Sequence, residues 1–357
     1  MENFTNQIVS EINSLDEKLN ECITTLRETL EKKGIEVVNT DKLLEMIRKV
    51  DDINTSTIIG EEKLPPWYQL ITKVENIWIS ANKITKKRRN ISTSVHNVNI
   101  YCIGGEDSNN NILNDLECYD SNSNTYTVKS NKYTKRRNSI SETVGNIIYN
   151  IGGYNGWNGI NTNESYDINS NTWIVKQSIP TARYLCYSGT VDNKIYCIGG
   201  HNNGYLNKNE CYDTNSDTWT TKLNLNIERQ GHGSTVLNNK IYCIGGFAQE
   251  DNSLYQYNIN EYYDPNTNSY TVKASAPEKN SAYLTETINN KIYCLYNVGL
   301  YMYDPDKNIW NNIISQIPEE LRGTGYGYSS GAVDNKIYCI GGYDGKNYLD
   351  NNEIYIP

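Results

Sequence analysis

The sequence is poor in the residues that mark several common protein classes. Its 357 residues include 2 Phe, 3 Met and 3 His. The histidines His96, His201 and His232 stand far apart and none has a second ligand at metal-site spacing. No apolar run approaches about 18 residues, and Met1–Asn6 lacks the basic and apolar regions of a signal peptide. The sequence therefore predicts no metal, no cofactor, no membrane span and no classical secretion.

Strong basic charge is also missing. The net charge is -9 and the isoelectric point is about 5.1, which disfavours a general nucleic-acid binder, since such a protein needs a dominant basic face. Nine cysteines are present, but no CxxC pair occurs. Most of them recur at equivalent positions of a repeat, so we expect small buried side chains in a reducing compartment and no disulfides.

What the sequence does contain is a repeat. Near-copies of Ile-Tyr-Cys-Ile-Gly-Gly begin at Ile100, Ile148, Ile195, Ile241, Ile292 and Ile337. Each copy is typical of a strand that ends at two glycines, which permit a positive φ. Five copies are followed by Tyr-Asp and then by Tyr or Trp seven residues after the first Tyr, at Tyr126, Trp173, Trp219, Tyr270 and Trp310. The Asn, Ser and Asp between the two aromatics indicate a hairpin turn, so each unit is expected to have four strands.

A strand ending in Gly-Gly, followed by Tyr-Asp and then Trp, resembles the kelch repeat, a β-propeller blade. The resemblance covers roughly residues 75–357 and implies a mostly β, six-bladed propeller within residues 65–357. The sixth copy lacks its Trp strand, and Asn76-Ile77-Trp78-Ile79 supplies one before the first copy. We therefore expect the N-terminal strand near Trp78 to close the ring, with Trp78 buried.

The first 64 residues form two further segments. Residues 1–33 carry apolar side chains at heptad spacing, which predicts an α-helical, coiled-coil-like oligomerisation helix. The alternative is a helix packed on the flank of the propeller. Residues 34–64 are expected to form a short helix and a linker. The oligomerisation residues are Ile8, Ile12, Leu15, Leu19, Cys22 and Leu26.

The stretch from Leu15 to Ile53 resembles N-terminal segments of tail proteins from clostridial bacteriophages and phage-tail-like bacteriocins (tailocins). The resemblance implies a homotrimeric, tail-fibre-type receptor-binding protein that attaches to a baseplate protein through its N-terminus. It would be made in the bacterial cytoplasm, released by lysis and located at the tail tip. Its partner would be a bacterial surface receptor, either a glycan or a surface-layer-type protein.

The long loops that follow the Gly-Gly positions and the connections between blades are expected to share one face of the propeller. Aromatic side chains beside Arg are typical of a recognition surface. The alternative is that each Arg only braces a blade junction and that the aromatics reflect the abundance of Tyr. The receptor-binding candidates are Tyr154, Trp157, His201, Tyr205, Phe247, Tyr255, Tyr257, Tyr343, Tyr348, Arg183, Arg229 and Arg322.

Two other functions stay open at this stage. Six-bladed kelch proteins include N-acetylneuraminate epimerase, so a sugar-acting enzyme is one alternative, although we find no acid/base pair to carry it. The other alternative is an intracellular kelch module that binds a partner protein. Fold alone does not choose between them, and we expect a non-enzymatic binding protein.

Overall fold

The computed structural model describes residues 76–231, 233–251, 253–279, 284–296, 299–314, 317–318, 321 and 327–357. These residues belong to one compact unit, Leu64–Pro357. The expected helices of residues 1–64 lie outside the described residues, and so do Ile8, Ile12, Leu15, Leu19, Cys22 and Leu26. Across the described part of the chain, no helix has the length and hydropathy needed to cross a membrane.

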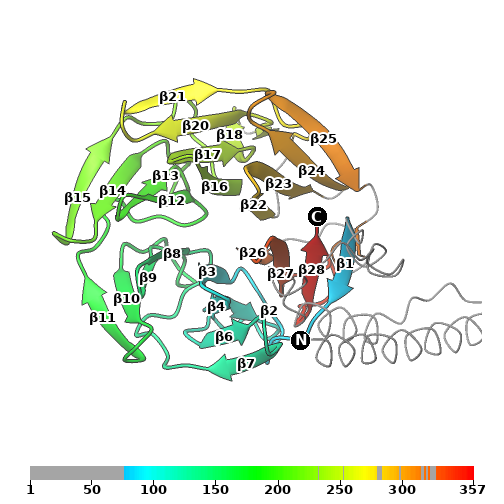
Figure 1. Ribbon diagram of the computed structural model, residues 1–357. Coiled ribbons are helices and arrows are strands. Elements are labelled where there is room, and N and C mark those ends of the chain that lie inside the picture. The colour runs from blue at the N-terminus through cyan, green and yellow to red at the C-terminus, as the bar shows by residue number, and fades with distance from the viewer. Residues whose placement is uncertain are drawn as a thin grey trace, which may run out of the picture. The chain divides into compact units, whose positions relative to one another are not determined.

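Six four-stranded antiparallel sheets stand around a central axis, which confirms the six-bladed propeller (Figure 1). Blade 1 is β3 (Ser92–His96), β4 (Asn99–Ile103), β6 (Leu116–Asp120) and β7 (Thr125–Val128); blade 2 is β8 (Ile140–Val144), β9 (Ile147–Ile151), β10 (Asn163–Asp167) and β11 (Thr172–Lys176). Blade 3 is β12 (Tyr187–Val191), β13 (Lys194–Ile198), β14 (Asn209–Asp213) and β15 (Thr218–Lys222); blade 4 is β16 (Gly233–Leu237), β17 (Lys240–Ile244), β20 (Asn260–Asp264) and β21 (Ser269–Val272). Blade 5 is β22 (Leu284–Ile288), β23 (Lys291–Tyr296), β24 (Gly299–Asp304) and β25 (Ile309–Ile314); blade 6 is β26 (Ser329–Val333), β27 (Lys336–Ile340), β28 (Asn352–Ile356) and β1 (Ile77–Ser80).

Two short ribbons lie outside the blades. The first pairs β2 (Arg88–Arg89) with β5 (Glu106–Asp107), and the second pairs β18 (Phe247–Glu250) with β19 (Ser253–Gln256). β5 and the β18–β19 ribbon belong to loops that follow Gly-Gly, whereas β2 belongs to the connection from β1 into blade 1. In blade 5 the equivalent loop is reduced to two residues, because β23 and β24 stay paired as far as Tyr296 opposite Gly299.

The N-terminal strand closes the ring, as its sequence predicts. In Figure 1 the blue β1 lies beside the red β28, and Trp78 is in register with Tyr355. The Tyr355 hydroxyl donates to Asn76 Oδ1 at 2.6 Å. The same Tyr-to-Asn or Tyr-to-Asp bond stabilises the hairpin of every other blade, as at Tyr166 and Asn171 (2.8 Å). Trp78 is only partly buried, which corrects the expectation of full burial.

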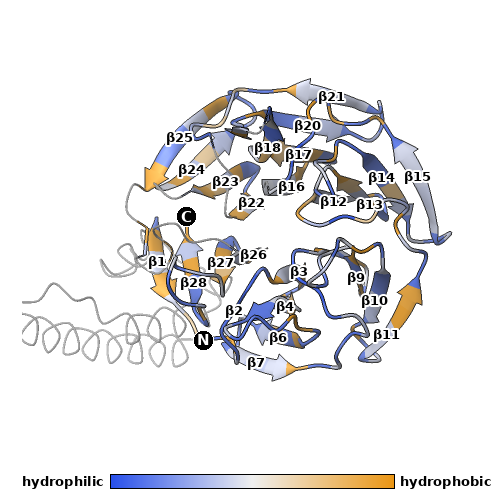
Figure 2. Ribbon diagram, turned by 180° about the vertical axis from the view of Figure 1, so that it is seen from behind, coloured by the Kyte–Doolittle hydropathy of each residue, from blue (hydrophilic) through white to orange (hydrophobic). Residues whose placement is uncertain are grey.

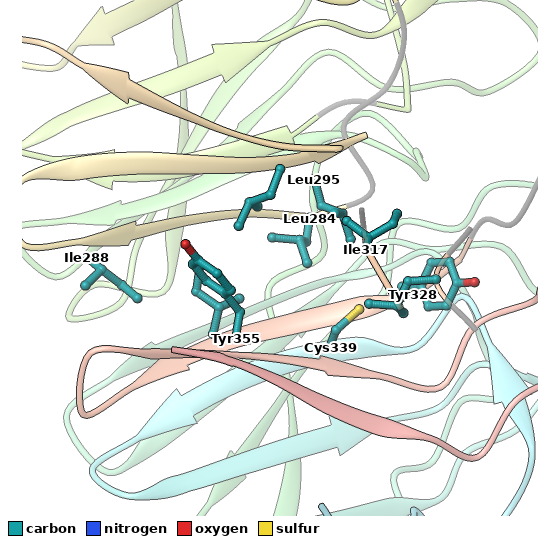
Figure 3. Packing of buried hydrophobic residues seen from close by; sticks show 10 residues of the cluster. Leu284, Ile288, Leu295, Ile317, Tyr328, Cys339 and Tyr355 are labelled. Atoms are coloured by element: carbon teal, nitrogen blue, oxygen red, sulfur yellow. The ribbon is translucent and has the colours of Figure 1, made fainter. Parts of the chain in front are cut away.

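Neighbouring blades pack against each other through apolar clusters, and the hydrophobic colouring lies mainly on the strands (Figure 2). Figure 3 shows one such cluster, in which Leu284 and Leu295 of blade 5 face Tyr328, Cys339 and Tyr355 of blade 6. In addition, the tyrosine of each Ile-Tyr-Cys strand contacts the Tyr-Asp tyrosine of the next blade. These contacts join Tyr101 to Tyr166, Tyr149 to Tyr212, Tyr196 to Tyr263, Tyr242 to Tyr303, Tyr293 to Tyr355 and Tyr338 to Tyr119, with ring centroids 5.6–6.2 Å apart.

The glycine pairs have the positive φ that their pattern predicts. Gly152 has a φ of 63° and Gly153 a φ of 103°. A side chain at Gly152 would also place its Cβ 2.6 Å from the Arg183 carbonyl oxygen, because the next connection passes directly beside it. The eight cysteines in the described residues are all free.

Candidate functional site: an aromatic arc on the loop-bearing face

One arginine in each of four connections between blades is fully buried. These brace arginines are Arg88, Arg136, Arg183 and Arg229, each with no exposed surface. Arg183 shows the arrangement. Its Nη1 donates to the carbonyl oxygens of Cys197, Gly199 and Lys208 at 3.0–3.2 Å, and its Nη2 forms an ion pair with Glu210. The other three are paired with Glu117, Glu164 and Glu261.

The backbone of each brace arginine holds the preceding blade. The Arg183 amide donates to the Ile160 carbonyl at 3.2 Å, and the Arg183 carbonyl accepts from the Gly153 amide at 2.8 Å. The side chain therefore binds its own blade while the main chain binds the blade before it. The sequence predicts that Arg183 and Arg229 contact a receptor. In the structure both side chains are fully buried and paired with Glu210 and Glu261, so we leave them out of the binding surface. Arg322 lies outside the described residues.

The residue that follows each brace arginine is partly exposed at Arg89, Arg137 and Tyr184 and buried at Gln230. It pairs in antiparallel fashion with the residue that follows Gly-Gly in its own blade. The pairs are Arg89 with Glu106, Arg137 with Tyr154, Tyr184 with His201, and Gln230 with Phe247. These short antiparallel pairs thus fix the backbone positions from which the side chains project.

Side chains from these positions form a continuous chain of contacts across five blades, which we call the aromatic arc. In blade 6, Tyr343 and Tyr348 lie under the Arg89 guanidinium, at 5.1 and 4.7 Å from its carbon to the ring centroids. The Arg137 guanidinium lies 5.1 Å from the Tyr154 ring. The arc consists of Tyr343, Tyr348, Arg89, Glu106, Arg137, Tyr154, Tyr184, His201, Tyr205 and Phe247.

Ring contacts continue the arc into blades 3 and 4. Tyr154 lies 5.1 Å from Tyr184, and Tyr184 lies 5.3 Å from His201. His201 meets Tyr205 edge-on at 5.1 Å, and Tyr205 meets Phe247 at 6.4 Å. Partial burial lowers the pKa of His201, which favours the neutral imidazole at neutral pH. This half of the arc is therefore uncharged and aromatic.

The other half is charged and is centred on Glu106. Its carboxylate accepts from Arg89 at 2.8 Å and from the Tyr348 hydroxyl at 2.6 Å, and it pairs with Arg137. Burial opposes ionisation of Glu106, but the bonds from Tyr348 and Arg89 and the charge of Arg137 outweigh it and lower its pKa. Burial and the bond to Glu106 raise the pKa of Tyr348 to about 12. Two guanidinium groups against one carboxylate leave a net positive charge at this end.

The structure joins six of the expected receptor-binding residues in the arc: Tyr154, His201, Tyr205, Phe247, Tyr343 and Tyr348. Trp157 stands apart at a loop tip with 85% of its surface exposed, and Tyr255 is 46% exposed on the β18–β19 ribbon. Tyr257 is half-buried, and its amide donates to the Gly246 carbonyl at 2.8 Å.

The receptor-binding candidates taken from the sequence do not include Arg89, Arg137, Tyr184 and Glu106. Their positions in the repeat could have identified them. Each of the first three directly follows a brace arginine, and Glu106 directly follows Gly-Gly as Tyr154 and His201 do. The doublets Arg88-Arg89 and Arg136-Arg137 thus each contain one fully buried and one partly exposed arginine.

Two family models match the chain. The KLHDC2/KLHL20/DRC7 Kelch-repeats domain matches residues 67–246, and the Kelch motif matches residues 228–277 and 324–357. No curated protein matches the chain. Half of the chain fits the first model, and the second model matches blades 4 and 6, in agreement with the repeated four-stranded sheets. The chain therefore belongs to the kelch-repeat family of β-propellers.

Proposed function

We propose that the protein is a non-enzymatic receptor-binding protein whose aromatic arc recognises a molecule of the bacterial surface. The kelch propeller is a fold of protein-interaction modules. The observation that carries the proposal is the arc itself, whose rings are partly exposed and held in fixed positions by their neighbours. Rings that are ordered before binding lose little conformational entropy on binding, which favours affinity.

The two halves of the arc suit different parts of one ligand. The rings from Tyr154 to Phe247 offer apolar faces, on which sugar rings or aliphatic side chains can stack. The end at Arg89 and Arg137 offers guanidinium donors to a carboxylate or phosphate. A surface glycan with acidic groups, or a surface-layer-type protein, has this combination of chemistry.

The proposed setting is the tail of a phage or tailocin. It rests on the resemblance of residues 15–53 to clostridial tail proteins, with the N-terminus attached to a baseplate protein. A trimer built through the heptad residues of the N-terminal segment would present three arcs, and light scattering of the full chain tests that state. Several weak sites on one particle raise avidity by roughly 10²–10⁴ without new contacts.

Removal of two aromatics on the loop-bearing face should strongly weaken attachment to susceptible cells. Trp157→Ala combined with Tyr205→Ala removes one exposed anchor and one ring of the arc. Binding energy concentrates in a few aromatic and arginine residues, so we expect apparent affinity to fall at least about thirtyfold, which corresponds to about 2 kcal/mol. The measurement is binding of labelled protein to cells, with thermal unfolding to verify the fold.

The matched control changes two exposed side chains in hairpin turns, Asn122→Ala with Asn215→Ala. These turns lie at the opposite ends of the strands from the arc, so attachment should be unchanged. Loss of attachment with the control pair, or full attachment by the folded Trp157/Tyr205 variant, would refute the proposal.

A further inference from the structure

The propeller has a central channel, which the proposed surface role does not use. The innermost strands of the six blades, β3, β8, β12, β16, β22 and β26, contact one another in that order around the ring. They enclose a cavity of about 570 Å³. More than half of the described residues that line it are Ser or Thr, two are Glu, and none is Lys, Arg or His.

The types of residue that line this channel repeat after three blades. The third residue of each innermost strand lies opposite the tyrosine of the adjacent Ile-Tyr-Cys strand, so all six share one level. In blade order these residues are Ser94, Glu142, Gly189, Thr235, Glu286 and Gly331. A hydroxyl, a carboxylate and a glycine thus occur twice, and each pair stands three blades apart, on opposite walls.

Equivalent residues in the two halves of the channel also make equivalent contacts with the next blade. Ser94 meets the Thr143 hydroxyl at 2.5 Å, and Thr235 meets the Thr287 hydroxyl at 2.8 Å. A Cβ at Gly189 would lie 2.7 Å from Val236 Cγ2, and a Cβ at Gly331 would lie 2.8 Å from Val95 Cγ2. The two halves of the channel are therefore alike in packing as well as in residue type.

Each carboxylate is held by a hydroxyl of the following blade. Thr190 donates to Glu142 at 2.9 Å, and Ser330 donates to Glu286 at 2.7 Å. Glu142 also accepts a hydrogen bond from Ser188. A carboxylate has room for about four hydrogen bonds, so each keeps further acceptor capacity. Burial raises the pKa of both, that of Glu286 to about 7 despite the bond from Ser330, with a contribution from the negative charge of Glu142. The channel thus holds two acids and no cationic side chain among its described residues.

We propose that the channel binds a linear diammonium ligand, with one ammonium group at Glu142 and the other at Glu286. Two positive charges at the ends of a flexible chain match two carboxylates on opposite walls. An ammonium group has three donors, so each end can also bind neighbouring Ser or Thr oxygens. A metal ion fits less well, since its ligands must converge within about 2.6 Å of one centre.

The test is calorimetric titration of the full-length protein with 1,4-diaminobutane at pH 8, where Glu286 is mostly ionised. Two controls keep the four-carbon chain and change the charge of the ligand: 1-aminobutane has one ammonium group and 1,4-butanediol has none. We expect the diamine to bind at least about tenfold more tightly than the monoamine, and the diol not to bind, because each charge-assisted contact contributes separately. This comparison uses only the unchanged protein.

Glu142→Gln and Glu286→Gln test the two ends separately. Glutamine keeps the shape and can still accept from Thr190 or Ser330, so the fold should persist. Each change should weaken diamine binding at least about tenfold and leave monoamine binding less affected. Glu228→Gln, an exposed glutamate outside the channel, is the matched control and should bind the diamine normally.

Several results would overturn the proposal. They are no diamine binding at millimolar concentration, equal binding of the diol, an equal loss in Glu228→Gln, or displacement of the diamine by micromolar Ca²⁺, which would show a metal site instead. The inference does not rest on the surface role of the arc, because the titration involves no cells and no receptor.

Discussion

A chain that begins at Ile84 is expected to lose cooperative unfolding and to aggregate. It lacks β1, which pairs with β28 over four residues, and it lacks Asn76, which precedes β1 and accepts from the Tyr355 hydroxyl. Without β1, β28 becomes an open edge with unpaired backbone groups, which invites pairing between molecules. Circular dichroism during heating should show a broad or absent transition, and light scattering should rise at low temperature.

A milder change tests the same seam. Trp78 is partly buried, with its ring 5.4 Å from that of Tyr355, so Trp78→Ala should lower the free energy of unfolding by about 3 kcal/mol, the lower end for a buried Trp. Trp157→Ala, which removes an 85% exposed ring, is the control and should change it by less than about 0.5 kcal/mol. If the shortened chain unfolds like the intact one, the seam is not closed by β1.

Arg183→Met should lower the free energy of unfolding by about 3–5 kcal/mol, the range for breaking a buried ion pair by removing one partner. The change leaves the Glu210 carboxylate buried without its charge partner. It also leaves the Cys197, Gly199 and Lys208 carbonyls without the donor that the arginine supplied. The measurement is equilibrium unfolding in urea, read by tryptophan fluorescence.

The comparison for Arg183→Met is an ion pair at the surface. Lys83 Nζ lies 3.0 Å from Asp350 Oδ1, with 68% of the lysine side chain exposed. Lys83→Ala should cost at most about 1 kcal/mol, because solvent screens the pair. If both substitutions have the same small effect, the brace arginines do not hold the blades together.

The strands were predictable because one pattern recurs with little change. Gly-Gly, Tyr-Asp and the hairpin Asn or Asp each perform one local task in every blade. The abundance of Tyr was open to a compositional explanation. The structure instead shows twelve tyrosines, including Tyr101 and Tyr166, in contacts that join all six pairs of neighbouring blades.

The site was harder to predict, for a physical reason. Arg88 and Arg89 are adjacent and identical in type, and only the direction of each side chain separates the buried brace from the partly exposed arginine of the arc. The role of Glu106 depends on Tyr348, which is 242 residues away in sequence and adjacent only after ring closure. The aromatics on the long loops were identifiable from composition, whereas their connection into one arc was not.

The most direct test of the central claim is hydroxyl-radical footprinting of the full chain bound to envelopes of susceptible cells. Aromatic side chains are strongly labelled, so they report contact with the receptor. We predict that binding protects Trp157, Tyr154 and Tyr205, while Tyr133, 66% exposed beside the outermost strand β11, stays labelled. Protection of Tyr133 with unchanged labelling of the arc would contradict the account, because the receptor would then contact the outer strands.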